Sequence, residues 1–224
     1  MKWSYGVTTV PERRHDLLPR TLASLKLAGF EEPHLFVDSE HGYAELGLPM
    51  TVRYPKVRTA GNWVLSAMEL YIRNPHADRY AVFQDDFVTY RNLRVYLERT
   101  PYPQRGYCNL YSFPSNEELA KGRLGWYESN QFGRGAVALM FSREALLTCL
   151  GSQHLLERPQ DSVRGHVKVD GGIVDAMRKA GWKEYVHNPS LVQHMGHVST
   201  MGNGTHKQSR SFKGEEFNAL EMLR

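Results

Sequence analysis

The alternation of short apolar strands with amphipathic helices in the N-terminal part of this chain is the feature that most constrains its fold. Strand-like runs are expected at residues 3–9, 34–37, 50–54 and 79–83, and helices at residues 16–28 and from Asn62 onward. Gly29 stands where the first helix would end, because glycine adopts the left-handed conformation without strain. The resulting β-α-β-β-α-β order predicts an α/β sandwich with a mostly parallel sheet, whose ligands bind beyond the carboxyl ends of the strands.

The second half of the chain continues this pattern less regularly. We expect strands at 107–111 and 136–141, a helix capped by Ser142 and another helix over 171–180. Residues 114–134 are polar, aromatic and glycine-bearing, which predicts a mobile binding loop. Residues 203–213 contain Lys207, Arg210 and Lys213 but no acid, which predicts a flexible basic segment. We therefore expect one domain over 1–200, followed over 201–224 by this segment and a short helix.

Composition narrows the class of protein. The chain has 224 residues, of which 41% are hydrophobic, so it is long enough for a full core. No apolar run approaches the roughly 20 residues of a membrane span, and no apolar secretory segment follows Met1, so we expect a cytoplasmic protein. Cys108 and Cys149 are expected to be buried, reduced thiols. The net charge of +4 suits anionic partners and is also ordinary for solubility.

Two adjacent acids follow the strand at 79–83. Asp85 and Asp86 come directly after Gln84, at the edge of the predicted sheet where ligands bind. Mg²⁺ and Mn²⁺ are commonly held by one or two carboxylates together with diphosphate oxygens. Adjacent acids after a strand also form turns, so the motif alone leaves metal binding and a structural turn open.

Histidines near the C-terminus offer a nitrogen ligand. His194 and His197 lie three residues apart in a segment without clear periodicity, and His166, His187 and His206 are weaker candidates. An imidazole there would bind the same ion or a phosphate, or it would make a structural hydrogen bond.

Asp170 and the end of the first strand complete the set of candidates. Asp170 precedes two glycines and a helix, so it is either an N-cap or a general base with room for an acceptor hydroxyl. Thr8, Thr9 and Arg13 lie where a nucleotide would bind in this architecture, and Arg13 would contact phosphate or remain a solvated charge. Asp175, inside the same helix as Asp170, is expected on a solvated face.

Several common nucleotide and metal sites are absent from the sequence. The chain has no Gly-x-Gly-x-x-Gly after a strand and no Gly-x-x-x-x-Gly-Lys-Ser/Thr, which removes the usual dinucleotide and P-loop sites. Two cysteines do not form a zinc-finger pattern.

Taken in order, these motifs resemble a GT-A glycosyltransferase. The residues that carry the resemblance are Gly-Val-Thr-Thr-Val-Pro-Glu-Arg at 6–13, Gln-Asp-Asp at 84–86, residues 135–143, Asp-Gly-Gly at 170–172 and Pro-Ser-Leu-Val-Gln-His-Met-Gly at 189–196. The last run is similar to the C-terminal signature of the N-acetylglucosaminyltransferase IV family. The resemblance to GT-A glycosyltransferases spans about residues 4–200. The chain also resembles the compact, phage-type TET-associated glycosyltransferases.

The resemblance implies a single-domain GT-A fold, a Rossmann-like α/β/α sandwich, with an inverting mechanism. Asp86 and His194 would bind manganese or magnesium, Asp85 would face the ribose, and Asp170 would be the catalytic base. The nucleotide of a UDP-sugar such as UDP-glucose would be bordered by Thr8, Thr9, Val10 and Arg13. Gln84 departs from the acidic residue often found at its position.

The TET-associated relatives further imply double-stranded DNA with 5-hydroxymethylcytosine as the acceptor, in a host cytoplasm if the protein is phage-encoded. The basic segment and the aromatic residues Trp126, Tyr127 and Phe132 are compatible with a DNA backbone and an extruded base. A glycan or surface-polysaccharide transferase and a non-catalytic nucleic-acid-binding protein are the alternatives. A nucleotidyltransferase is disfavoured because no glycine-rich loop follows the first strand.

Overall fold

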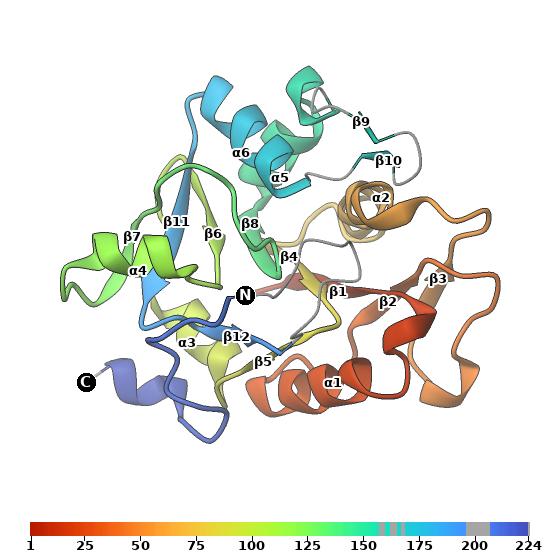
Figure 1. Cartoon of the computed structure of the whole chain (residues 1–224), viewed down its shortest axis with the longest axis horizontal. Coiled ribbons are helices and arrows are strands. Elements are labelled where there is room, and N and C mark those ends of the chain that lie inside the picture. Colours follow the sequence, from red (N-terminus) through yellow and green to blue (C-terminus); the bar gives the residue numbers. More distant parts are fainter. Residues whose placement is uncertain (157–159, 162–164, 167–168, 196–206, 224) are drawn as a thin grey trace.

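A computed structural model of the chain is organised around one eight-stranded mixed sheet (Figure 1). The structure describes residues 1–156, 160–161, 165–166, 169–195 and 207–223. The strands occur in the order β3-β2-β1-β4-β8-β6-β11-β7. Their bounds are β1 Trp3–Thr9, β2 His34–Val37, β3 Met50–Val52, β4 Arg79–Gln84, β6 Gly106–Asn109, β7 Gly125–Glu128, β8 Ala138–Ser142 and β11 Lys183–Asn188. Only β8 and β7 run against the direction of the other strands of this sheet, which confirms the predicted mostly parallel α/β fold.

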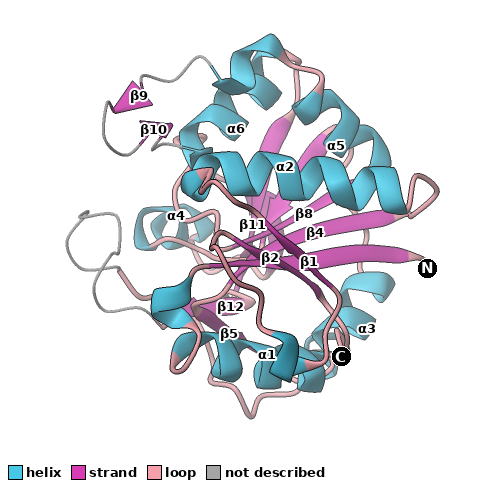
Figure 2. Cartoon of the chain, turned by 90° about the vertical axis from the view of Figure 1, so that its right-hand side faces the viewer, coloured by secondary structure: helices cyan, strands magenta, loops and turns pink. Residues whose placement is uncertain are grey.

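Helices cover both faces of the sheet (Figure 2). The helices α2 Arg58–Arg73, α5 Arg143–Leu150 and α6 Val169–Lys179 share one apolar core with one face, and α1 Leu17–Ala28 and α3 Leu93–Arg99 pack against the other. Helix α4 Pro114–Ala120 contacts β11. Two small antiparallel sheets pair β5 Phe87–Thr89 with β12 Val192–His194, and β9 Gln160–Asp161 with β10 Gly165–His166. Short 3-10 helices occur at Pro11–Arg13, Ala44–Leu46, Gln153–Leu156 and Ala219–Leu223.

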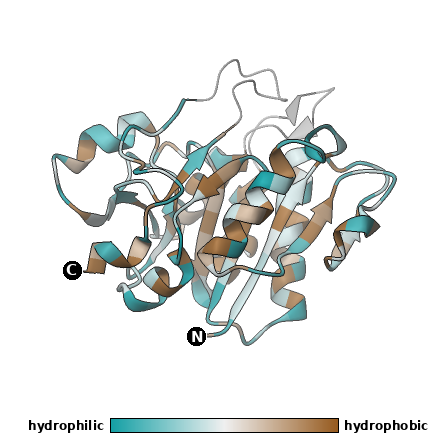
Figure 3. Cartoon of the chain, turned by 90° about the horizontal axis from the view of Figure 1, so that it is seen from below, coloured by the Kyte–Doolittle hydropathy of each residue, from teal (hydrophilic) through white to brown (hydrophobic). Residues whose placement is uncertain are grey.

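Local sequence signals account for the helices that were placed correctly. The Asp16 carboxylate accepts a hydrogen bond from the Leu17 N–H at the start of α1, and Gly29 ends that helix at a φ of 95°. Ser142 caps α5 by accepting from the Ala145 N–H at 3.1 Å. In Figure 3 the helices carry both apolar and hydrophilic residues, while the outer loops are mostly hydrophilic. A helix of this mixed kind buries its apolar stripe against the sheet.

The predicted start of α2 is wrong, for a tertiary reason. The helix begins at Arg58, and Asn62 lies inside it, where its Nδ2 donates to the Phe36 carbonyl at 3.0 Å. The capping acceptor comes from the end of β2, because the Asp38 carboxylate accepts from the N–H groups of Val57 and Arg58 at 2.8 and 2.9 Å. A cap so distant in sequence leaves no local signal.

The prediction of one mobile loop over 114–134 is also wrong, because the segment contains α4 and β7. Strand β7 pairs antiparallel with β11, and it contains Trp126 and Tyr127. Elements β5, α3 and β12 were likewise not predicted, since each is seven residues or shorter.

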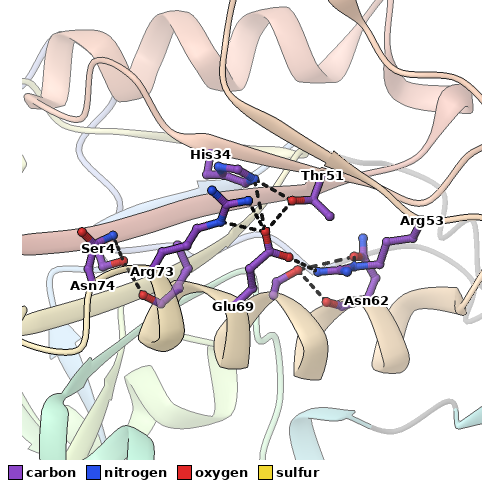
Figure 4. Close-up of polar contacts among 10 residues, drawn as sticks. Ser4, His34, Thr51, Arg53, Asn62, Glu69, Arg73 and Asn74 are labelled. Carbon is purple, nitrogen blue, oxygen red and sulfur yellow. Dashed lines mark hydrogen bonds and ion pairs between the residues drawn. The ribbon is translucent and has the colours of Figure 1, made fainter.

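A polar cluster joins α2 to the edge strand β3 and its neighbour β2 (Figure 4). Glu69 accepts from Thr51 Oγ1 at 2.5 Å and from Arg73 Nε at 2.8 Å, and it forms an ion pair with Arg53 at 3.1 Å. Thr51 Oγ1 also lies 2.9 Å from His34 Nε2. Burial alone would raise the pKa of Glu69, but these hydrogen bonds outweigh it and lower the pKa. Because these polar groups satisfy one another, the cluster has a structural role.

The basic stretch near the C-terminus is docked where the structure describes it. Glu117 of α4 accepts from the N–H groups of Ser211 and Arg210 at 2.9 and 3.0 Å, and from the hydroxyl groups of Ser209 and Ser211. The Phe212 ring stacks on Tyr90 at a centroid distance of 4.8 Å. The prediction of a flexible segment is therefore wrong for residues 207–213, while residues 203–206 lie outside the described residues.

The docking of this segment is expected to depend on pH. Burial alone would raise the pKa of the Glu117 carboxyl group. The hydrogen bonds that it accepts from Ser209 and Ser211 outweigh this effect and lower the pKa below 4.5. The stabilising contribution is therefore complete above pH 4.5 and is lost as the pH falls through the lower folded-state pKa. Hydrogen exchange at residues 207–213, corrected for intrinsic rates, should be constant above that pH and accelerate below it.

Substitution of this carboxylate should have the same effect at neutral pH. Glu117→Gln should accelerate exchange in the segment by roughly tenfold, the effect of losing about 1.4 kcal/mol of charge-assisted hydrogen bonding. Glu118→Gln, at an exposed neighbouring position, serves as the control. Equal exchange in the two variants would contradict the role of Glu117.

Candidate functional site

Two carboxylates are buried in the turn that links β4 to β5. Asp85 is 2% exposed and Asp86 is fully buried. Both contact one guanidinium: Arg13 Nη1 lies 2.7 Å from Asp85 Oδ1 and also forms an ion pair with Asp86 Oδ2. When both acids are ionised, these three side chains together retain one negative charge.

Burial determines the electrostatics of this group. It raises the pKa of Asp85 to about 6, although the Arg13 guanidinium acts in the opposite direction. Burial would lower the pKa of Arg13, but the negative charges of Asp86 and Asp85 outweigh it and raise the pKa. Arg13 therefore stays charged, and one cation does not fully offset the desolvation of two neighbouring acids.

His194 reaches the same place from the C-terminal part of the chain. Its Nε2 lies 3.4 Å from Asp86 Oδ2, and its side chain is 5% exposed. Pairing of β12 with β5 sets this position, since His194 is in register with Phe87. The next residue, Met195, donates its N–H to the Asp86 carbonyl at 2.8 Å.

The end of β1 is tied to the acidic turn. The Val10 N–H donates to Asp85 Oδ2 at 3.3 Å. Thr8 Oγ1 donates to the Phe83 carbonyl at 3.2 Å, and Thr9 Oγ1 donates to the Val10 carbonyl at 3.5 Å. The structure therefore brings the candidates from β1 together with Asp85, Asp86 and His194.

Asp170 lies in the first turn of α6 rather than at its N-cap. Its Oδ2 accepts from the N–H groups of Gly135 and Ala136 at 2.8 and 3.1 Å. Val137, the next residue, accepts a hydrogen bond from the Gln84 N–H at 2.8 Å, directly before the acidic pair. These backbone contacts connect Asp170 with the acidic turn, which follows the carboxyl end of the central strand β4.

Glycine is required in the loop that binds Asp170. Gly135 has a φ of 75°, and a Cβ there would lie 2.5 Å from the Tyr111 ring. A Cβ on Gly133, whose φ is 62°, would lie 2.5 Å from the Asp170 carbonyl oxygen. These close approaches allow the backbone of the loop to reach the carboxylate.

Glu184 of β11 is a buried acid that the sequence reasoning missed. Its carboxylate accepts from Ser129 Oγ at 2.5 Å, Asn109 Nδ2 at 3.2 Å and the Tyr107 hydroxyl at 3.3 Å, and burial raises its pKa. Its backbone exchanges two hydrogen bonds with the Gln131 side chain. Glu184 therefore holds the loop that binds Asp170. The strand reads Lys-Glu-Tyr-Val-His-Asn, with polar residues at four of its six positions, so no apolar alternation in the sequence marked Glu184 as buried.

His187 is not part of this cluster. His187 Nδ1 lies 2.7 Å from the Pro189 carbonyl, and its Nε2 lies 2.6 Å from the Tyr96 hydroxyl. Burial lowers the pKa of His187 to about 4, so it is a neutral structural residue at pH 7. The side chain of His166 and the whole of His197 and His206 lie outside the described residues.

Other predicted residues have structural surroundings. Cys108 and Cys149 are buried free thiols, as expected, and burial raises the pKa of each. Asp175 is 29% exposed at its side chain and forms an ion pair with Arg178 at 3.6 Å. Among the three aromatic residues suggested for a base, Tyr127 is buried, Trp126 packs on His187 and Phe132 is 69% exposed.

Comparisons with known proteins show the fold. No protein-family model and no curated protein matches the sequence. The structure is similar to GalNAc-T7 solved with UDP, GalNAc and Mn²⁺, at a TM-score of 0.59 and 13% identity, covering 95% of this chain and 44% of that one. It is also similar to a nucleotidyl transferase from Methanothermobacter thermautotroptrophicus, at a TM-score of 0.50 and 13% identity, covering 83% and 86% of the two chains.

The chain therefore has the α/β fold that GT-A glycosyltransferases share with nucleotidyltransferases. It spans less than half the length of the GalNAc-T7 structure. Among the described residues, no helix has the length and apolar character needed to cross a membrane.

Arg13 should be important for stability. Arg13→Met removes the positive charge from two buried carboxylates, so we expect the free energy of unfolding to fall by about 3–5 kcal/mol. Arg14→Met should cost about 0–1 kcal/mol, because the Arg14–Glu45 pair is partly exposed, with side chains 32% and 52% accessible to solvent. Urea denaturation of both variants measures the difference, and equal losses would show that the buried cluster does not depend on Arg13.

Proposed function

We propose that the protein is a metal-dependent, inverting glycosyltransferase that moves a sugar from a nucleotide-sugar to an acceptor hydroxyl. The observation that supports this most is the buried group of Arg13, Asp85, Asp86 and His194, connected through Gln84 to Asp170 at one edge of a GT-A sheet. Ligands of such sheets bind at this edge.

The acidic turn is chemically suited to a divalent metal. Within the described residues no three Asp, Glu, His or Cys side chains converge as a complete metal site. Mn²⁺ and Mg²⁺ need fewer protein ligands when a diphosphate supplies the rest, and two carboxylates with one guanidinium retain a negative charge. Asp86 and His194 would hold the ion, which when bound would neutralise charge on the departing diphosphate.

In this proposal the donor nucleotide would bind at the end of β1. Thr8, Thr9, Val10 and Arg13 would border the nucleotide, and Asp85 would face its ribose. The UDP and Mn²⁺ named for the GalNAc-T7 structure agree with a UDP-sugar donor, of which UDP-glucose is our candidate.

Asp170 would act as the general base. The acceptor oxygen forms a bond to the anomeric carbon while the bond from that carbon to the diphosphate oxygen breaks, and Asp170 takes the hydroxyl proton. Two backbone N–H groups orient the carboxylate for this transfer. Displacement from the opposite face inverts the anomeric configuration.

The backbone after β1 favours glycosyl over nucleotidyl transfer. A phosphate cradle needs backbone N–H groups that point at the ligand. Here Val10 donates to Asp85, Pro11 has no N–H, and Arg13 and Arg14 donate within the 3-10 turn.

For the acceptor we propose 5-hydroxymethylcytosine in double-stranded DNA, with a glycan as the alternative. The test is nucleoside mass spectrometry of such DNA after incubation with the protein, Mn²⁺ and a mixture of nucleotide-sugars. A sugar-sized mass gain supports the proposal. No gain on DNA, together with sugar transfer to oligosaccharides, would assign the acceptor to glycans.

Asp170→Asn should lower kcat by about 10²–10⁴-fold, because it removes the proton acceptor. The affinity for Mn²⁺ and UDP should stay within about twofold, because Asp170 lies outside the acidic turn. Asp175→Asn in the same helix is the control and should retain its rate. A comparable rate in both variants would remove Asp170 from catalysis.

Asp86→Asn should weaken Mn²⁺ binding in the presence of UDP by more than about tenfold, because one charged ligand is lost. Asp78→Asn, an exposed acid before the opposite end of β4, should leave binding unchanged. Isothermal titration of Mn²⁺ measures both. Unaltered binding by the Asp86 variant would place the metal elsewhere.

A further inference from the structure

The loop that binds Asp170 carries two exposed side chains, Phe132 and Arg134, and Arg134 shares the half-buried Phe113 ring with the exposed Lys207. We call Phe113, Phe132, Arg134 and Lys207 the aromatic–cationic patch. Arg134 Cζ and Lys207 Nζ lie 5.2 and 5.8 Å from the centroid of the Phe113 ring, and Phe132 is 69% exposed. Two cations from distant parts of the chain therefore share one ring.

The backbone beneath the patch is held by hydrogen bonds. The Phe132 N–H donates to Asn130 Oδ1 at 3.1 Å, and the Arg134 carbonyl accepts from Asn109 Nδ2 at 3.3 Å. The Lys207 carbonyl accepts from the Tyr111 hydroxyl. Because these hydrogen bonds fix the backbone that carries the side chains, less conformational entropy is lost when a ligand binds.

The charges of the patch have no acidic partner in the described part of the chain. Neither Arg134 nor Lys207 forms an ion pair with any residue that the structure describes. Glu117, on the neighbouring helix α4, is engaged by the segment Ser209 to Ser211. The patch is consequently suited to a ligand that carries negative charge.

The patch adjoins the proposed base. Arg134 directly precedes Gly135, whose N–H binds the Asp170 carboxylate at 2.8 Å. The Tyr111 ring lies between this loop and the acidic turn. It faces Gly135 of the loop and packs edge-on against His194 at a centroid distance of 6.4 Å. A ligand on the patch would therefore present its reacting group near Asp170.

We propose that the aromatic–cationic patch is the acceptor site and that it binds a polynucleotide. A base or its neighbour stacks on Phe132, while Arg134 and Lys207 contact the flanking phosphates. This assignment rests on the proposed function, whose acceptor it specifies. A neutral glycan would use the aromatic rings but not the paired cations, so charge favours the polynucleotide.

Binding of fluorescein-labelled DNA containing 5-hydroxymethylcytosine, without donor and at several salt concentrations, tests the assignment. Phe132→Ala should weaken binding about fivefold or more, since stacking on one base contributes about 1–3 kcal/mol. Phe132→Trp should bind the DNA as tightly as the unaltered protein, because it keeps an aromatic ring for stacking. The double variant Arg134→Gln/Lys207→Gln should lower the slope of log K against log[salt] by about two, one for each lost phosphate contact.

Two variants on other surfaces serve as matched controls. Ile72 is an exposed apolar residue of α2 and Arg99 an exposed cation of α3, so Ile72→Ala and Arg99→Gln should bind DNA like the unaltered protein. Melting temperatures of all variants verify that they are folded.

Three results would overturn the assignment: patch variants that bind DNA as tightly as the controls, an unchanged salt slope, or no DNA binding by the unaltered protein. Binding of an oligosaccharide that depends on Phe132 but not on salt would reassign the patch to a glycan. Titration of Mn²⁺ and UDP tests the donor site separately, so a failed acceptor assignment remains distinguishable from a failed transferase proposal.

Discussion

The ion pairs between Arg13 and the two buried acids of the β4–β5 turn are the interaction on which the rest of this site depends. Two adjacent carboxylates at a sheet edge repel each other and lose hydration, and a single guanidinium offsets part of that cost. Because Arg13 comes from the turn after β1, the same contacts fix the end of β1 against β4. The one negative charge that these three side chains retain attracts a cation to the acidic turn. The same residues therefore stabilise the fold and form the candidate metal site.

A second set of contacts positions Asp170 relative to that edge. Glu184 holds the segment that includes Ser129 and Gln131, and the glycines that follow bring two N–H groups to the Asp170 carboxylate. The antiparallel strand β8 begins just after this loop, so the loop meets the carboxyl end of β4. Because β8 runs antiparallel to β4, the loop before β8 lies beside the acidic turn after β4. The Asp170 carboxylate of α6, which binds this loop, is thereby held near the acidic turn.

The C-terminal segment extends this surface. Residues 207–213 are bound by Glu117 and by Tyr90, and they place Lys207 against the same Phe113 ring that Arg134 contacts. The basic stretch is thus docked on the protein, and its Lys207 shares the Phe113 ring with Arg134, the residue before the Gly135 that binds Asp170. This arrangement connects the charge of the segment with the proposed acceptor.

The sequence by itself determined the α/β class, the central strands, α1, α5 and the candidates Arg13, Asp85, Asp86, Asp170 and His194, because periodicity, caps and strand-end acids are local signals. Only the tertiary structure decided that Asp38 caps α2, that β7 and β12 form at all, and that Glu184 supports the loop around Asp170. These features depend on pairing between segments far apart in the chain, which leaves no local pattern. The same reason explains why Trp126 and Tyr127 proved structural while Phe132 remained exposed: the pairing of β7 with β11 selects which aromatic residues are buried.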